Sequence, residues 1–129
     1  MTRISGFFAS GLLLLLLSPY LLRILGSYFP SVRPRINTLI KGLKTIHPFA
    51  GFCLLIVGAI HGYIALGGFR LHTGSLLYLA VFMTAFFGGF FKLKKKKILL
   101  QLHRGFVLLI AIFWAIHFLF PSALYYLLR

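Results

Sequence analysis

The sequence contains neither aspartate nor glutamate, although it carries 14 lysines and arginines among its 129 residues. A soluble domain of this size needs a charged surface of mixed sign, whereas hydrophobic residues make up 60% of this chain. The composition therefore excludes an ordinary soluble domain and predicts an integral membrane protein. The missing carboxylates also argue against a carboxylate-bound metal ion and against a dedicated proton pathway within the chain.

Cysteine is nearly absent as well. The single cysteine, Cys53, lies in an apolar run. A disulfide framework is therefore excluded, and no CxxC or CxxCH motif is present. A covalently attached c-type haem is excluded on the same ground.

Four apolar stretches approach or exceed the roughly 20 residues that a helix needs to cross a membrane. They cover residues 4–28, 48–66, 73–91 and 98–120 approximately. Pro48 suits the opening turn of the second helix, because proline needs no amide partner there. The first stretch lacks an A-x-A-like cleavage site, so we expect a retained helix and not a signal peptide. We predict an all-α fold: one domain, residues 1–129, forming an up-and-down four-helix transmembrane bundle.

The basic residues predict the orientation of this bundle. Ten of them belong to one face, nine in the connections after the first and third helices and one just inside the fourth helix: Arg33, Arg35, Lys41, Lys44, Lys92, Lys94, Lys95, Lys96, Lys97 and Arg104. Arg3, Arg70 and Arg129 belong to the opposite face. The positive-inside rule then puts both termini outside, in a cell's inner membrane or an organellar equivalent. Because the charges cluster between apolar segments, anionic lipid is the expected partner, and nucleic acid is not.

Four of the five histidines form two pairs with the same spacing. His47 and His61 are fourteen residues apart, and so are His103 and His117. Fourteen residues make close to four helical turns, so each pair faces one way, about 21 Å apart along the helix axis. The second and fourth helices run in the same direction, so we expect His47 beside His103 near the inner surface. His61 and His117 would then meet nearer the outer surface.

Two imidazoles at each level suit one kind of centre better than others. Zinc and manganese sites usually need three or four ligands, often including carboxylate or thiolate. A haem iron lacks only two axial ligands, and two opposed imidazoles complete it for electron transfer. Ionisable residues inside a membrane are costly and are usually functional. We therefore predict two non-covalent b-type haems in the core of the bundle.

Gly74 and Gly88 on the third helix are also fourteen residues apart. A flat macrocycle between helices needs neighbours of little bulk, and these glycines fall near the outer and inner histidine levels respectively. Ordinary close packing of small residues between membrane helices is the alternative explanation.

The histidine segments HPFAGFCLLIVGAIH and HRGFVLLIAIFWAIH resemble the di-haem four-helix core of the cytochrome b superfamily. LHRGFVLLIAIFWAIH is also similar to ferric-reductase-like transmembrane domains. The resemblance implies that His47 and His103 ligate the inner haem iron, and His61 and His117 the outer one.

The sequence departs from these relatives in two ways. Gly11 and Gly26 on the first helix are fifteen residues apart, and no quinol-oxidation motif, flavin domain or nicotinamide domain is present. The resemblance therefore carries over electron transfer and no substrate-converting activity. Donor and acceptor would be other redox subunits of a membrane complex, a quinone or a soluble carrier.

Anionic partners must come from outside the chain. Haem propionates and lipid phosphates are the natural partners of Arg104, Lys44 and Arg23 inside, and of Arg70 outside. His72, next to the third helix, could bind an outer propionate or border a quinone pocket, but an interfacial position explains it best. Two other functions stay open: a pigment-binding protein and a purely structural membrane subunit.

Overall fold

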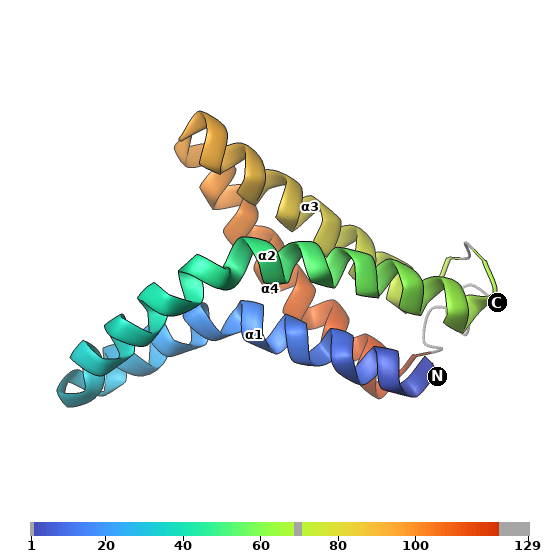
Figure 1. The fold of residues 1–129 in the computed structure, drawn as a ribbon, viewed down its shortest axis with the longest axis horizontal. Coiled ribbons are helices and arrows are strands. Elements are labelled where there is room, and N and C mark those ends of the chain that lie inside the picture. Colours follow the sequence, from blue (N-terminus) through green and yellow to red (C-terminus); the bar gives the residue numbers. More distant parts are fainter. Residues whose placement is uncertain (1, 69–70, 122–129) are drawn as a thin grey trace. The chain divides into compact units, whose positions relative to one another are not determined.

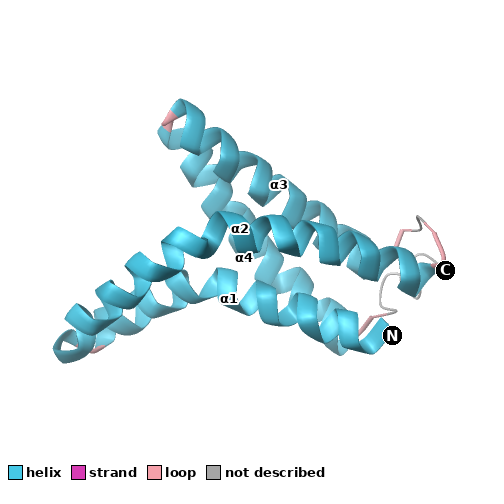
Figure 2. Cartoon of the chain, viewed as in Figure 1, coloured by secondary structure: helices cyan, strands magenta, loops and turns pink. Residues whose placement is uncertain are grey.

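The computed structural model describes residues 2–68 and 71–121 and contains four long helices. They are α1 (Thr2–Tyr28), α2 (Arg33–Leu66), α3 (Thr73–Lys94) and α4 (Lys97–Leu119), and a short 3-10 turn, η1 (Pro30–Val32), joins the first two (Figure 1). Within the described residues there is no strand, and only short connections interrupt the helices (Figure 2). The all-α prediction is confirmed.

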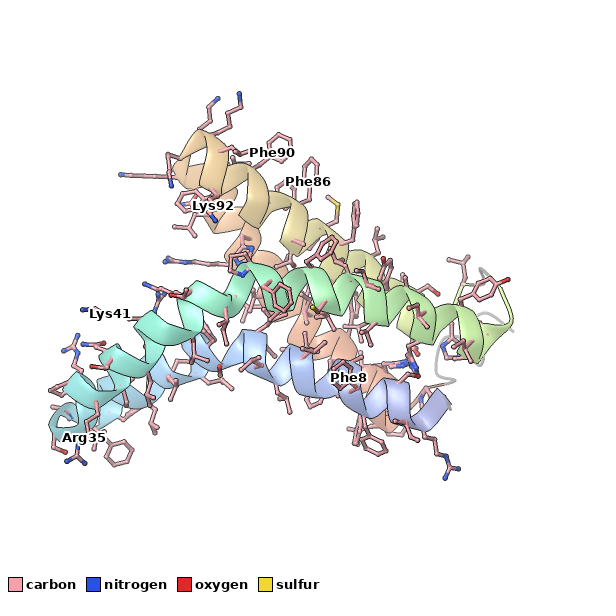
Figure 3. The ribbon with its side chains drawn as sticks, in the orientation of Figure 1. Phe8, Arg35, Lys41, Phe86, Phe90 and Lys92 are labelled. Atoms are coloured by element: carbon pink, nitrogen blue, oxygen red, sulfur yellow. The ribbon has the colours of Figure 1, made fainter. Side chains whose placement is uncertain are left out.

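All four helices are long and apolar enough to cross a membrane. Their large apolar side chains are mostly exposed, as Figure 3 shows for Phe8 on α1 and for Phe86 and Phe90 on α3. A soluble protein rarely exposes contiguous apolar surface on this scale. The fold is therefore compatible with a multi-pass integral membrane protein.

Three of the four predicted helices agree with the structure to within one turn. The predicted ranges 4–28, 73–91 and 98–120 correspond to α1, α3 and α4. Pro19 lies inside α1, and Pro121 follows the end of α4. Long apolar runs bounded by polar residues or proline indicated these positions well.

The predicted start of the second helix is wrong. Helix α2 begins at Arg33 and continues through Pro48, which lies inside it and does not open it. Proline in a helix interior removes one backbone hydrogen bond, but that loss does not end this helix. Pro34 occupies the first turn, where proline is tolerated, and Ile36 and Ile40 form a buried stripe at helical spacing.

The basic residues expected in a loop therefore lie on a helix. Arg33, Arg35, Lys41 and Lys44 all belong to the first half of α2, and Figure 3 shows the side chains of Arg35 and Lys41 extending from it. Helix α2 has 34 residues, which corresponds to about 51 Å. It is thus longer than the roughly 30 Å of hydrocarbon that a bilayer presents.

The chain divides into two compact units, whose boundary lies inside α2 between Val57 and Gly58. In the first unit, η1 reverses the chain, and a β-carbon on Gly26 would lie 3.6 Å from side-chain atoms of Ile36. The second unit holds the end of α2 together with α3 and α4. The assembly of all four helices into one bundle stays a prediction.

Helices α3 and α4 pack side by side as a hairpin (Figure 1). Lys95 ends α3 in the left-handed conformation, with a φ of 54°. On α3, the buried residues are Thr73, Ala80 and Thr84, and on α4 the buried residue is Ile110. The contact thus runs along small or hydroxyl-bearing residues of α3, as is common where membrane helices approach closely.

Candidate functional site

His103 and His117 lie on one face of α4. Each is seven residues, or about two turns, from the buried Ile110, and both are half-buried. The expectation that this pair faces one way is confirmed.

The ring of His103 is held by the backbone of α3. Its Nδ1 lies 2.8 Å from the carbonyl oxygen of Thr84. Because a carbonyl oxygen only accepts, His103 must carry a proton on Nδ1. In the neutral ring the lone pair is then on Nε2, the nitrogen that a metal would take. The hydroxyl of Thr84 donates separately to the carbonyl oxygen of Ala80 within α3, at 2.7 Å.

The ring of His117 is held by a side chain instead. The Oγ1 of Thr73 lies 3.0 Å from His117 Nδ1 and donates to the carbonyl oxygen of Pro121 at 2.6 Å. A threonine hydroxyl has one proton, and here that proton is donated in the hydrogen bond to the Pro121 carbonyl. Oγ1 must therefore accept from Nδ1–H of His117. His117 therefore has the same tautomer as His103, with its lone pair on Nε2.

Gly74 and Gly88 lie directly against these two rings. A β-carbon on Gly88 would be 2.9 Å from His103 Nδ1, and one on Gly74 would be 3.0 Å from His117 Cε1. The structure thus brings both predicted glycines to the predicted histidines of α4. The missing side chains make room for the imidazole rings themselves. A β-carbon on Gly89, by contrast, would have no such neighbour within 4 Å.

His72 caps the N-terminus of α3. Its Nδ1 accepts from the amide of Gly74 at 3.5 Å, and its own amide donates to Ser75 Oγ at 2.9 Å. Its ring also meets the ring of His117 edge to face, with 6.0 Å between the centroids. His72 is therefore a structural neighbour of His117, a role that the sequence did not indicate.

The two expected histidine pairs differ in what the structure says of them. His61 belongs to the same compact unit as His117, but the pairing of the two stays a prediction. His47 belongs to the other compact unit, so its pairing with His103 stays a prediction.

Arg104 and Arg70 are expected to contact haem propionates, and the structure gives little information about either. Arg104 follows His103 on α4 and is exposed. Arg70 lies outside the described residues. The expected contacts of both with haem propionates stay predictions.

The surroundings of His103 and His117 fit ligands to a haem iron. Metal-binding histidines almost always donate their second ring N–H to a carbonyl, a carboxylate or a similar acceptor, which fixes the orientation of the ring. Both histidines of α4 do so. Among the described residues, no three His, Cys, Asp or Glu side chains gather as a metal site. A haem needs only two such side chains, because it brings four nitrogen ligands of its own.

Sequence reasoning missed Thr73 and Thr84, the two buried polar residues among those described. For Thr84 a signal was available, since it interrupts the apolar run of α3, whereas Thr73 opens the helix. A polar group at such a position needs a hydrogen-bond partner.

Comparisons with protein-family models, with curated proteins and with solved structures found no match. The function must therefore be inferred from the chain's own residues.

Proposed function

We propose that the chain is a haem-carrying membrane subunit, similar to cytochrome b, that passes electrons across the bilayer within a larger oxidoreductase. One observation carries the proposal. On α4, a histidine with its Nδ1–H donated to α3 and its ring against a glycine of α3 occurs twice, fourteen residues apart. Ordinary helix packing does not call for such a repeat.

Four histidines would hold two b-type haems. His47 and His103 are the proposed ligands of the inner haem, and His61 and His117 those of the outer one. Bound haem would supply a one-electron iron centre at each level.

The surrounding residues would prepare the ligands. The acceptors on α3 hold each ring in one tautomer and make Nε2 a stronger donor to iron. Gly74 and Gly88 let the rings approach the helix backbone. The apolar side chains of α3 and α4 keep water from the two haems. Little rearrangement of the surroundings is therefore needed when an electron arrives or leaves.

The membrane orientation is part of the same proposal. The basic first half of α2 and the lysines between α3 and α4 would lie on the inner face, with both termini outside. Anionic lipid would neutralise these charges. Arg104 on the inner side and Arg70 on the outer side are the proposed partners of the haem propionates. Redox partners would be other subunits or a quinone.

The pairing of the histidines gives the sharpest test. We would purify the chain in detergent, record the reduced-minus-oxidised spectrum and quantify haem per chain. His61→Ala and His117→Ala should each remove one and the same haem, so the double variant should lose no more than either single one. His103→Ala should remove the other haem. Gln101→Ala, an exposed change on α4, serves as the control and should keep both.

Three results would overturn the proposal. Additive haem loss in His61→Ala/His117→Ala would contradict the pairing. A chlorophyll spectrum would identify a pigment-binding protein. A chain that stays colourless when expressed with excess haem would identify a structural membrane subunit.

A further inference from the structure

The two histidines of α4 donate to acceptors of different chemical kinds. His103 donates to a backbone carbonyl, which belongs to every residue that could stand at position 84. His117 donates to the hydroxyl of Thr73, which only serine or threonine supplies in this form. A substitution can therefore remove one acceptor and cannot remove the other.

Thr73 is well placed to act as an acceptor. The residue is 6% exposed, which makes it one of the two buried polar residues described. Its proton is directed to the Pro121 carbonyl at 2.6 Å, which turns the oxygen lone pairs toward His117. His72 Nδ1 lies 3.3 Å from the same oxygen, but it accepts from the amide of Gly74 and so does not donate to Thr73.

The bond to Pro121 also strengthens the bond to His117. A hydroxyl that donates becomes a better acceptor, because hydrogen bonds in a chain polarise one another. The chain here runs from His117 through Thr73 to Pro121. It draws electron density toward the imidazole and favours one tautomer of the ring.

We propose that Thr73 is a positioning residue for the outer site, holding His117 with Nε2 toward the ligand and setting its donor strength at that site alone. This inference rests on the proposed haem-binding function. The outer haem is then tuned by a side chain and the inner haem by the backbone. A substitution at position 73 can thus change the midpoint potential of the outer haem without changing that of the inner haem.

The matched pair Thr73→Val and Thr84→Val tests the proposal. Both changes replace a buried hydroxyl by a methyl group of similar size, but only the first removes the acceptor of a histidine. In the haem-loaded chain, Thr73→Val should raise the midpoint potential of one haem and leave that of the other unchanged. We also expect a roughly 10- to 100-fold loss of affinity at that site, as is typical when a metal ligand loses its hydrogen-bond partner. Thr84→Val should change neither potential, and Thr73→Ser should restore the native values.

A second readout separates this inference from the haem proposal. In the haem-free chain, the nitrogen chemical shifts of ¹⁵N-labelled histidine report which ring nitrogen of His117 carries the proton. Thr73→Val should turn a single tautomer into a mixture, whereas Thr84→Val should leave His103 unchanged. Circular dichroism confirms that both variants remain helical.

The outcomes are distinct. Equal effects of the two valine variants, or an unchanged tautomer and potential in Thr73→Val, would overturn the role of Thr73. A chain that binds no haem but shows the tautomer change would overturn the haem proposal and the tuning of potential, while leaving the hydrogen-bond assignment intact.

Discussion

Each end of the α3–α4 hairpin contains a histidine of α4, a glycine of α3 against its ring and an acceptor for its Nδ1–H. The acceptors at the two ends differ in kind. At the lysine-rich turn, His103 meets a backbone carbonyl and Gly88, and the helix ends in the left-handed residue Lys95. At the other end, His117 meets a threonine hydroxyl and Gly74, next to the capping ring of His72.

This difference shows which part of the arrangement is repeated. The two histidines are fourteen residues apart, and so are the two glycines, but the acceptors do not follow this interval. Thr73 immediately precedes its glycine, whereas Thr84 lies one turn before Gly88. The repeated glycines therefore give each imidazole ring the same room, while the acceptor differs from one end to the other. The carbonyl end should be rigid and the hydroxyl end adjustable.

The rigid end should show the larger effect of added bulk. In Gly88→Ala the new methyl group would lie 2.9 Å from His103 Nδ1, and the ring cannot move away without losing its bond to Thr84. We expect the free energy of unfolding to fall by about 1–3 kcal/mol, as overpacking usually costs, and the inner haem to be lost. Thermal unfolding in detergent and haem content measure both effects.

The adjacent Gly89→Ala is the control for this change. Nothing lies within 4 Å of its added methyl group, so it should leave haem content unchanged and raise stability by up to about 1 kcal/mol through helix propensity. Equal losses in Gly88→Ala and Gly89→Ala would refute the ring contact as the cause.

The adjustable end should tolerate the same change better. In Gly74→Ala the methyl group would lie 3.0 Å from His117 Cε1, so a shift of a few tenths of an ångström relieves the contact. The acceptor there is a side chain that can rotate with the ring. We expect a smaller loss of stability than in Gly88→Ala, together with a shifted potential of a retained outer haem. A greater loss of stability in Gly74→Ala would contradict the proposed difference between the ends.

The turn beyond the rigid end offers a small stabilising change. Lys95 has a φ of 54°, which glycine adopts without strain. Lys95→Gly should raise the free energy of unfolding by up to about 1 kcal/mol, with both haems kept, because relief of the left-handed strain exceeds the backbone entropy that glycine loses on folding. Lys94→Gly removes the same charge within the last turn of α3, where glycine is disfavoured, and should not stabilise. Equal melting temperatures for the two variants would show that backbone strain at Lys95 is negligible.

The sequence predicted the parts of this molecule that depend on local patterns. The spans of α1, α3 and α4 follow from apolar length, and the positions of Gly74 and Gly88 at the two histidine levels follow from their matched spacing. Their contacts with the imidazole rings were not predicted, because the room was expected to serve a macrocycle. The start of α2 was missed because Pro48 and the nearby basic residues resemble a boundary. In the structure, the buried stripe through Ile36 and Ile40 shows that the helical periodicity begins well before this proline.

The acceptors could not be predicted for a different reason. Whether Thr73 or Ser75 faces His117 depends on how α3 is rotated about its axis, and adjacent residues differ by about 100°. Only the packing of α3 on α4 fixes that angle. At Thr84 the acceptor is the backbone, so no side chain could have indicated it.

The amount and type of haem bound by the native chain decide whether it is a di-haem membrane subunit. We would purify the chain in detergent after expression with ample haem and measure haem per chain together with the reduced-minus-oxidised spectrum. We expect two haems per chain with a low-spin, b-type spectrum, because two imidazole ligands would complete the coordination of each iron. A chain without haem, or with haem of high-spin character that leaves a coordination position open, would contradict it.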